Sequence, residues 1–309
     1  GANPHASNGS LCTAPDFPGR LDRIQARGGK VVVVDPRRSE TAMRSDEHLA
    51  IRPASDAHLL AGIAHTMLAE GIAKPDNVAA HCNGLDRLPE LLAPYSAEAV
   101  AGVCGIDADT IRRIARELVD APCAAVYGRI GTCTQEFGTL ASWLVDVVNI
   151  LSGNLDREGG AMFTKGAVGQ PSSKGRPGSG KGFRMGRQVS RVGKHLEALG
   201  EGQVRVLVTN GGNPVSSNAN SNRLAKAFDS LEFMVSVDPY INETTRHADV
   251  ILPPPSALQK SHYDLALYNF AVHNVANYSP AVLPLETFPD GEHQPDEWEI
   301  ILRLAAAVS

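Results

Sequence analysis

Short apolar runs alternate with amphipathic segments along most of the chain. Residues 31–34 are four consecutive valines, which is typical of a strand buried on both faces of a parallel sheet. Two more strands lie in the stretch 204–255, and an apolar segment covers residues 49–52. The pattern predicts a further strand over residues 124–127, and helices over 20–27, 57–70, parts of 73–122, about 137–151 and 295–308. Strands that alternate with helices predict an α/β fold with mainly parallel sheets.

Two stretches of the chain, residues 1–46 and 204–249, repeat one pattern. Each has an Asn-Pro turn, a helical segment, a strand that ends in Asp-Pro, then Glu-Thr and a second Asp. In both copies the second Asp lies eleven residues after the first, and the Glu-Thr pair lies five and six after it. The repeated residues are Asn3, Asp35, Glu40, Thr41 and Asp46 in one copy, and Asn213, Asp238, Glu243, Thr244 and Asp249 in the other. The repeat predicts two related Rossmann-like, doubly wound domains, related by a pseudo-twofold.

Each copy has features that suit a nucleotide. A parallel strand that stops at a Gly-rich turn exposes backbone amides at its carboxyl end, and the next helix adds its positive N-terminus, so an anion is favoured there. A carboxylate at the tip of the following strand suits a sugar hydroxyl or the amino face of a purine. Two copies suggest two nucleotide-like ligands or one extended ligand. The alternative is a duplicated fold that binds no ligand, because fold alone does not establish function.

The predicted domains are residues 1–163 and 195–309, each a dinucleotide-binding α/β domain. Residues 164–194 separate them and hold eight Gly, eight Lys or Arg and no acidic residue. Such a composition cannot bury a core, so this stretch is expected to be a loop or linker. Its positive charge would favour a polyanionic ligand beside it, but a solvated linker has the same composition.

Composition and charge narrow the function classes. The 309 residues have room for about two domains, and a net charge of −5 argues against a surface for duplex nucleic acid. No apolar run approaches the roughly 20 residues of a membrane span. The five cysteines are never closer than ten residues, so no CxxC metal motif exists, and they are expected to be buried thiols in a reducing, cytoplasmic compartment.

Several side chains near the predicted strand ends are candidate ligand contacts, and each has a structural alternative. Arg37 and Arg38 could pair with phosphate, or be a solvated surface pair. Ser55 or Asp56 could contact the ligand, or cap the helix that follows. Gly131, in the turn after the strand predicted at 124–127, is placed for a backbone contact. The chain has no initiator Met, and Gly1 falls in the turn of the first copy, so we expect the first strand of that copy to precede Gly1.

Four stretches of the sequence carry a resemblance to a known family. They are GANPHASNGS with VVVVDPRRSETAMRSDEHLAIRPASD, GRIGTCTQEFGT with LSGNLDREGGAMF, VTNGGNP with SVDPYINETTRHADVILP, and DEWEIILRLA. In this order they resemble the molybdopterin-guanine-dinucleotide-dependent oxidoreductases related to dimethyl sulfoxide reductase, periplasmic nitrate reductase and formate dehydrogenase. The resemblance implies that two α/β domains each grip one guanine dinucleotide arm of a molybdenum bis(molybdopterin guanine dinucleotide) cofactor.

The resemblance also implies individual roles. Dinucleotide contacts are expected at Asn3, Asp35, Arg37, Arg38, Ser39, Ser55, Asp56, Gly131, Asn213, Asp238 and Lys260. The family's 4Fe-4S cluster motif and its molybdenum ligand belong upstream of Gly1, and a C-terminal β-barrel belongs downstream, so this chain resembles the central part of such an enzyme. We expect it to be inactive alone, and we assign no catalytic residue and no metal ligand in it. A small-molecule redox substrate and an electron-transfer partner are implied for the intact enzyme, and the sequence does not identify them.

Two further hypotheses belong to other classes. The large subunit of respiratory complex I resembles the same fold and is an electron-carrying scaffold without pterin. Retention of both Asn-Pro turns and both Asp-Pro tips favours cofactor binding over that scaffold. A stand-alone nucleotide-binding protein is disfavoured because the chain starts in mid-turn.

Overall fold

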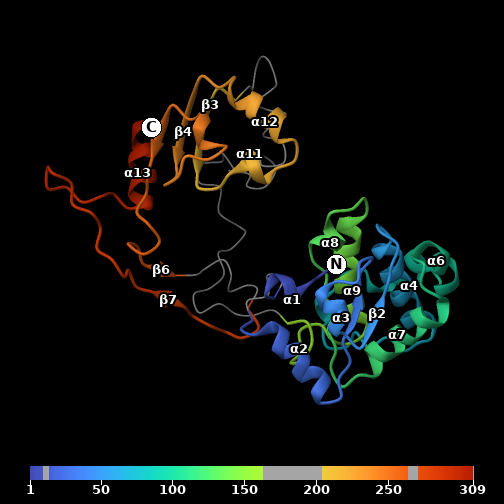
Figure 1. Cartoon of the computed structure of the whole chain (residues 1–309). Helices are drawn as coiled ribbons and strands as arrows, with labels where there is room; N and C mark the ends of the chain where they lie inside the picture. The colour runs from blue at the N-terminus through green and yellow to red at the C-terminus, as the bar shows by residue number, and fades with distance from the viewer. Residues whose placement is uncertain (10–13, 163–203, 264–270, 309) are drawn as a thin grey trace. The chain divides into compact units, whose positions relative to one another are not determined.

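The structure is a computed structural model that describes residues 1–9, 14–162, 204–263 and 271–308 (Figure 1). The chain divides into two compact units, Gly1–Gly169 with Leu265–Val275, and Gln170–Asp264 with Ala276–Ser309. Each unit has its own parallel sheet with helices, as the α/β prediction requires. The basic stretch 164–194 lies outside the described residues. No helix in the described part of the chain is long and apolar enough to cross a membrane.

The first unit combines a two-stranded parallel sheet with a helical layer. Strands β1 (Val32–Val34) and β2 (Glu47–Leu49) pair in the register Val32 to Glu47 and Val34 to Leu49. The helices of this unit are α1 (Pro4–Ser7), α2 (Phe17–Ala26), α3 (Glu40–Arg44), α4 (Asp56–Ala69), α5 (Leu88–Leu92), α6 (Ala97–Cys104), α7 (Ala108–Asp120), α8 (Ile130–Cys133) and α9 (Gly138–Leu151), with 3-10 turns η1 (Ala79–His81) and η2 (Leu85–Arg87). The predicted helices at 20–27, 57–70 and about 137–151 correspond to α2, α4 and α9.

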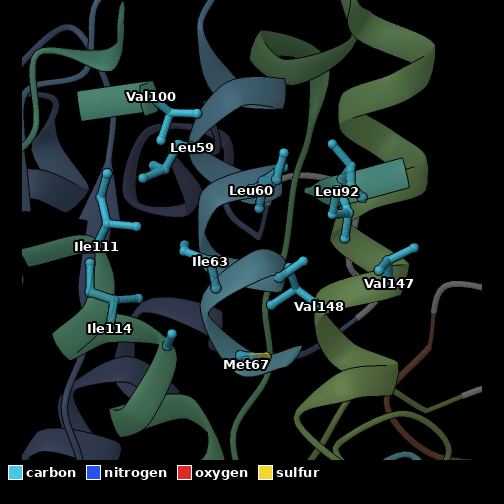
Figure 2. Packing of buried hydrophobic residues seen from close by; sticks show 14 of the residues in the cluster. Leu59, Leu60, Ile63, Met67, Leu92, Val100, Ile111, Ile114, Val147 and Val148 are labelled. Carbon is cyan, nitrogen blue, oxygen red and sulfur yellow. The ribbon is translucent and has the colours of Figure 1, made fainter. Parts of the chain in front are cut away.

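The core of the first unit is built around α4, which packs against α5, α6, α7 and α9. Leu60, Ile63 and Met67 of α4 are buried, and Figure 2 shows them between Ile111 of α7 on one side and Val148 of α9 on the other. A helix that is apolar on most of its circumference is buried in this way. Full burial of each aliphatic side chain contributes about 1.5–3 kcal/mol to the stability of the fold. This helical layer is therefore a stable support for the loops of the first unit.

The strand predicted over residues 124–127 does not form. Side-chain amides take the place of a neighbouring strand: the amide of Ala124 donates to Asn154 Oδ1, and that of Val126 donates to Asn149 Oδ1, each at 2.9 Å. Asn149 Nδ2 in turn donates to the carbonyl of Val126 at 2.8 Å. The apolar run is therefore satisfied by two buried Asn side chains from α9 and the turn after it, a pairing that strand patterns do not reveal.

The second unit has a three-stranded parallel sheet in the order β3-β4-β5, with β4 in the centre. Its elements are β3 (Val206–Asn210), α11 (Pro214–Ser217), α12 (Ser221–Phe228), β4 (Phe233–Val237), η5 (Thr245–His247), β5 (Val250–Leu252), β6 (His262–Tyr263), β7 (Tyr278–Ser279) and α13 (Glu297–Val308). Met234 of β4 packs with Leu224 and Phe228 of α12 in a small core. The C-terminal helix predicted over 295–308 is α13, which buries Ile300 and exposes Trp298.

Candidate functional site

The turn before α1 is held by the side chain of Asn3. Asn3 Nδ2 donates to Glu40 Oε2 at 2.6 Å, and Asn3 Oδ1 accepts from Thr41 Oγ1 at 2.8 Å and from the Thr41 amide at 3.2 Å. Because the Thr41 amide can only donate, the atom it meets must be the Asn oxygen, so the orientation of the Asn3 side chain is determined. Thr41 is buried and also accepts from the amide of His5 at 3.2 Å. We call Asn3, Glu40 and Thr41 the first clamp.

The second unit repeats this arrangement with Asn213, Glu243 and Thr244, which we call the second clamp. Asn213 Nδ2 donates to Glu243 Oε2 at 2.5 Å, Thr244 Oγ1 donates to Asn213 Oδ1 at 2.7 Å, and the amide of Val215 donates to Thr244 Oγ1 at 3.0 Å. The backbone agrees as well: φ and ψ are −131° and 70° at Asn3, and −129° and 73° at Asn213. The repeat in the sequence is therefore also a repeat of local structure.

The backbone around each clamp follows the same plan. The amides of Val31 and Met234 donate to Asp46 Oδ2 and Asp249 Oδ2, both at 2.7 Å. The nitrogens of Gly1 and Gly211 donate to the last carbonyls of β1 and β4, at 3.0 and 2.9 Å. The second Asp of each copy therefore ties down the backbone near the beginning of its strand, and we assign it no part in the site.

Asp35 and Asp238 lie at the carboxyl ends of β1 and β4, as predicted. Their Oδ1 atoms accept from the amides of Arg37 and Tyr240, both at 2.8 Å, which closes the same tight turn in each unit. Asp238 is 6% exposed, and its Oδ2 lies 3.3 Å from Asn242 Nδ2. A carboxylate can accept about four hydrogen bonds, so both groups retain acceptor capacity toward a ligand.

The turn after Asp35 presents the three predicted side chains differently. Arg37 and Arg38 are exposed, and Arg37 approaches Glu40 at 3.4 Å with 72% of its side chain accessible, a pairing of little energetic weight. Ser39 is buried, and its hydroxyl accepts from the amide of Ala42 at 3.3 Å as the N-cap of α3. The arginines are therefore free to reorient toward an anion, whereas the Ser39 hydroxyl is buried and its oxygen already accepts the capping hydrogen bond.

Ser55 and Asp56 lie at the start of α4, and Gly131 lies in the short helix α8 of the same unit. Ser55 occupies the N-cap position of α4 but does not cap with its side chain, because its hydroxyl donates to the carbonyl of Arg52 at 2.6 Å. Asp56 accepts at 2.9 Å from Gln135 Nε2, a contact that ties α4 to the segment after α8. A Cβ built on Gly131 would lie 2.7 Å from the Cα of Gly1, so only glycine allows these two turns to touch. The structure thus places Gly131 against the turn of Asn3.

In the second unit, Lys260 is paired rather than free. Its Nζ donates to Glu297 Oε2 at 2.5 Å, at the start of α13. This hydrogen bond is the main reason that the pKa of Glu297 is lowered, and Asn210 at the end of β3 also bonds to that carboxylate. Lys260 therefore lies toward the carboxyl end of the sheet, where a ligand was predicted, with Glu297 as a partner that sequence gave no reason to expect.

A separate cavity of about 300 Å³ lies in the first unit between α4, α5 and α9. Its lining is mostly apolar, with Tyr95, Phe137 and Trp143 partly exposed at its surface and His58 packed edge-on against Tyr95 and Phe137. The cavity contains none of the predicted contact residues.

Among the described residues no three His, Cys, Asp or Glu side chains form a group that could hold a metal ion. Cys82, Cys104, Cys123 and Cys133 are free thiols. Of these four described cysteines only Cys104 is fully buried, and burial raises the pKa of its thiol to about 11, whereas Cys123 and Cys133 are exposed. The expectation of uniformly buried cysteines is therefore wrong for these two, because they lie in a bend after α7 and in the four-residue helix α8 instead of on a core-facing helix.

Comparison with known proteins identifies the family. The family model "Molybdopterin oxidoreductase" matches residues 14–267, which is most of the chain. The chain belongs to the molybdopterin oxidoreductase family. Similar proteins include a dimethyl sulfoxide/trimethylamine N-oxide reductase of Rhodobacter capsulatus (27% identical, 79% of this chain and 34% of the relative) and a nitrate reductase of Symbiobacterium thermophilum (28% identical, 89% and 40%). The resemblance to this family is confirmed.

The solved structure of acetylene hydratase from Pelobacter acetylenicus has the same fold, with a TM-score of 0.75 and 20% identity over 93% of this chain and 44% of that one. The chain thus spans 34–44% of the length of these proteins. Membership of the molybdopterin oxidoreductase family implies a molybdenum–pterin cofactor.

Sequence reasoning missed six contributors to the local geometry, four of which belong to the repeat. Glu40, Thr41, Glu243 and Thr244 were recognised as parts of the repeat but not as neighbours of Asn3 and Asn213. The signal was present, because the Glu-Thr offset from the strand-end Asp is the same in both copies. For Gln135 and Glu297 no comparable signal exists.

Proposed function

We propose that this chain is the central cofactor-binding portion of a molybdenum oxidoreductase and that each unit holds one guanine dinucleotide arm of a bis(molybdopterin guanine dinucleotide) cofactor. The observation that carries the proposal is the duplicated site: the same Asn-Pro turn stands beside the same carboxylate at a strand end in both units. Two equivalent sites suit a ligand with two equivalent arms. When bound, the cofactor supplies the redox chemistry, in which an oxygen atom or a hydride equivalent moves to or from a small-molecule substrate.

The residues present suit such a group. Gly211 and Gly212 are exposed with positive φ values of 61° and 79°, and a Cβ built on either would meet no described atom within 4 Å, so the main chain is open to a phosphate. The carboxylates of Asp35 and Asp238 would accept from guanine nitrogens or ribose hydroxyls. Arg37 and Arg38 would meet the pyrophosphate of one arm, and Lys260 would approach the other.

The remaining parts of this proposal rest on the family resemblance. A 4Fe-4S cluster, the molybdenum ligand, an electron-transfer partner and the substrate would all lie outside this chain. A cytoplasmic location is part of the same proposal and is supported by four free cysteines. In this chain we assign binding and orientation, and no proton transfer, to the residues named above.

One observation favours the second candidate, a scaffold without cofactor related to the large subunit of complex I. The side chains of Asn3 and Asn213, one oxygen of Asp35 and both oxygens of Asp238 make internal hydrogen bonds. Folding alone would therefore account for their presence in the sequence, and the two candidates must be separated by measuring binding.

Calorimetric titration of the 309-residue chain with GDP, a surrogate for one arm, tests the proposal. We expect saturable binding at two sites, with Asp35→Ala weakening one and Asp238→Ala weakening the other. The control is Asp22→Ala, an Asp on α2 outside both sites, which should bind as wild type. Absence of binding by a folded chain would reject preformed dinucleotide sites in these two units and would favour the scaffold.

A further inference from the structure

The two Asn side chains share one feature: both polar ends of each are held by other residues of the same unit, at the surface. In each, Nδ2 donates to a Glu carboxylate and Oδ1 accepts from a Thr hydroxyl. The first clamp joins residues 37 positions apart and the second joins residues 30 positions apart, so each ties an Asn-Pro turn to the segment beyond a strand end. A side chain held at both ends in this way fixes the backbone that carries it.

The geometry points to Glu40 and Glu243 as positioning residues: each holds its Asn so that the main chain of the Asn-Pro turn faces the nucleotide, while the Asn side chain makes no ligand contact. This inference rests on the proposed function, because it assigns how the two dinucleotide sites are kept in shape. It assigns the ligand contact at Asn3 and Asn213 to the backbone, and it adds two acidic residues to the support of sites that bind an anion.

A carboxylate close to a phosphate site would repel the ligand if it faced it. Here each carboxylate faces the Asn amide, and the hydrogen bond from that amide is the main cause of the lowered pKa of Glu40 and of Glu243. The charged form is therefore the one that the clamp favours. Hydrogen bonds to an ionised acceptor are roughly twice as strong as neutral ones, which suits a residue whose task is to hold a turn.

An exchange of the two groups tests whether the clamp, or the Asn amide itself, is required. Asn3→Asp places a second carboxylate within hydrogen-bond distance of Glu40, so the first clamp opens. The double variant Asn3→Asp with Glu40→Gln restores the hydrogen bonds of the clamp. The amide of the new Gln donates to the new carboxylate, which reverses that hydrogen bond, and the Thr41 hydroxyl and amide still donate to the side-chain oxygen at position 3. The net charge of the double variant equals that of wild type.

We expect Asn3→Asp to weaken GDP binding at one of the two sites by about tenfold, and the double variant to return to within about threefold of wild type. The unaltered second unit reports in the same titration as an internal control, and Asn213→Asp with Glu243→Gln should reproduce the result at the other site. A double variant that stays as weak as Asn3→Asp would overturn the inference, since the clamp would be restored and only the Asn amide would be missing.

A second pair of variants covers the case in which Asn3→Asp does not fold. Glu40→Gln keeps an acceptor for Asn3 Nδ2 and should bind GDP within about threefold of wild type, whereas Glu40→Met keeps the length of the side chain without an acceptor and should lose about tenfold. Equal affinity of these two variants would overturn the inference. If the wild-type chain itself binds no GDP, the proposed function and the positioning role both fail. If the wild-type chain binds GDP but the double variant does not recover affinity, only the positioning role is rejected.

Discussion

The turns after Asp35 and Asp238 have the same backbone hydrogen bonds but different exposed side chains. In the first unit the two positions that follow Asp-Pro are Arg37 and Arg38, and in the second they are Tyr240 and Ile241, which are 74% and 81% exposed. The hydrogen bond that closes each turn has the same length, 2.8 Å. The duplicated backbone therefore does not imply duplicated chemistry: one turn offers positive charge, and the other offers an aromatic ring and an aliphatic side chain.

The clamps also differ in how much they depend on Thr. Asn3 Oδ1 accepts from both the hydroxyl and the amide of Thr41, whereas the amide of Thr244 donates to Asn242 Oδ1 instead of to Asn213. Position 242 is Asn where the first copy has Ser39, and this change redirects the backbone hydrogen bond. The second clamp consequently relies on one hydroxyl for a contact that the first clamp makes twice.

The largest expected effect follows from this difference. Thr244→Val keeps the shape of the side chain but removes its hydroxyl. Asn213 Oδ1 then loses a donor, and the amide of buried Val215 loses its acceptor. We expect this variant to lower the free energy of unfolding of the second unit by about 2 kcal/mol. Thr41→Val should cost the first unit only about 1 kcal/mol, because the Thr41 amide remains. Hydrogen exchange in urea, read separately on peptides of each unit, measures both. Equal losses would contradict the distinction between the clamps.

An exchange of turn side chains should have the next largest effect. Replacing Arg37 and Arg38 by Tyr and Ile should weaken GDP binding to the first unit by about tenfold and remove most of its salt dependence, because two phosphate-pairing cations are lost. The reverse exchange, Tyr240→Arg with Ile241→Arg, should increase the salt dependence of GDP binding to the second unit, because two cations join Lys260. Titrations at low and raised salt compare the four cases. An unchanged salt dependence after the first exchange would show that these arginines do not face the phosphates.

The smallest expected effect is one that the two units share. The pKa values of Glu40 and Glu243 are lowered in the folded chain from the ordinary value of 4.5. A lowered folded pKa stabilises the fold above 4.5, and this contribution is lost as the pH falls through the folded values. Stability from neutral to acidic pH should therefore decline less in Glu40→Gln with Glu243→Gln than in wild type, as measured by urea midpoints. Parallel pH curves for the two proteins would show that the clamps do not depend on the charge.

Much of the fold could be predicted because short-range sequence patterns specify it. The valines of β1, the alternation of strands with helices and the fixed Asp-to-Asp offset all led to an α/β fold with two related units. The strand ends placed Asp35 and Asp238 correctly for the same reason, since the carboxyl end of a parallel strand is where a doubly wound fold exposes such residues.

Other features depended on contacts between distant segments. The sequence by itself determined that Asn-Pro, Asp-Pro and Glu-Thr occur twice at matching offsets, because those offsets are set by one strand and its flanking turns. Only the tertiary structure decided that each Glu-Thr pair bonds to an Asn that precedes it by 30 or more residues. It also decided that Asn149 and Asn154 take the place of a strand beside residues 124–126. The pairing of Lys260 with Glu297 is a third contact of this kind. A hydrogen bond between segments so far apart leaves no periodicity in the sequence, because it forms only when packing of the helices and sheet has brought both partners to the same edge.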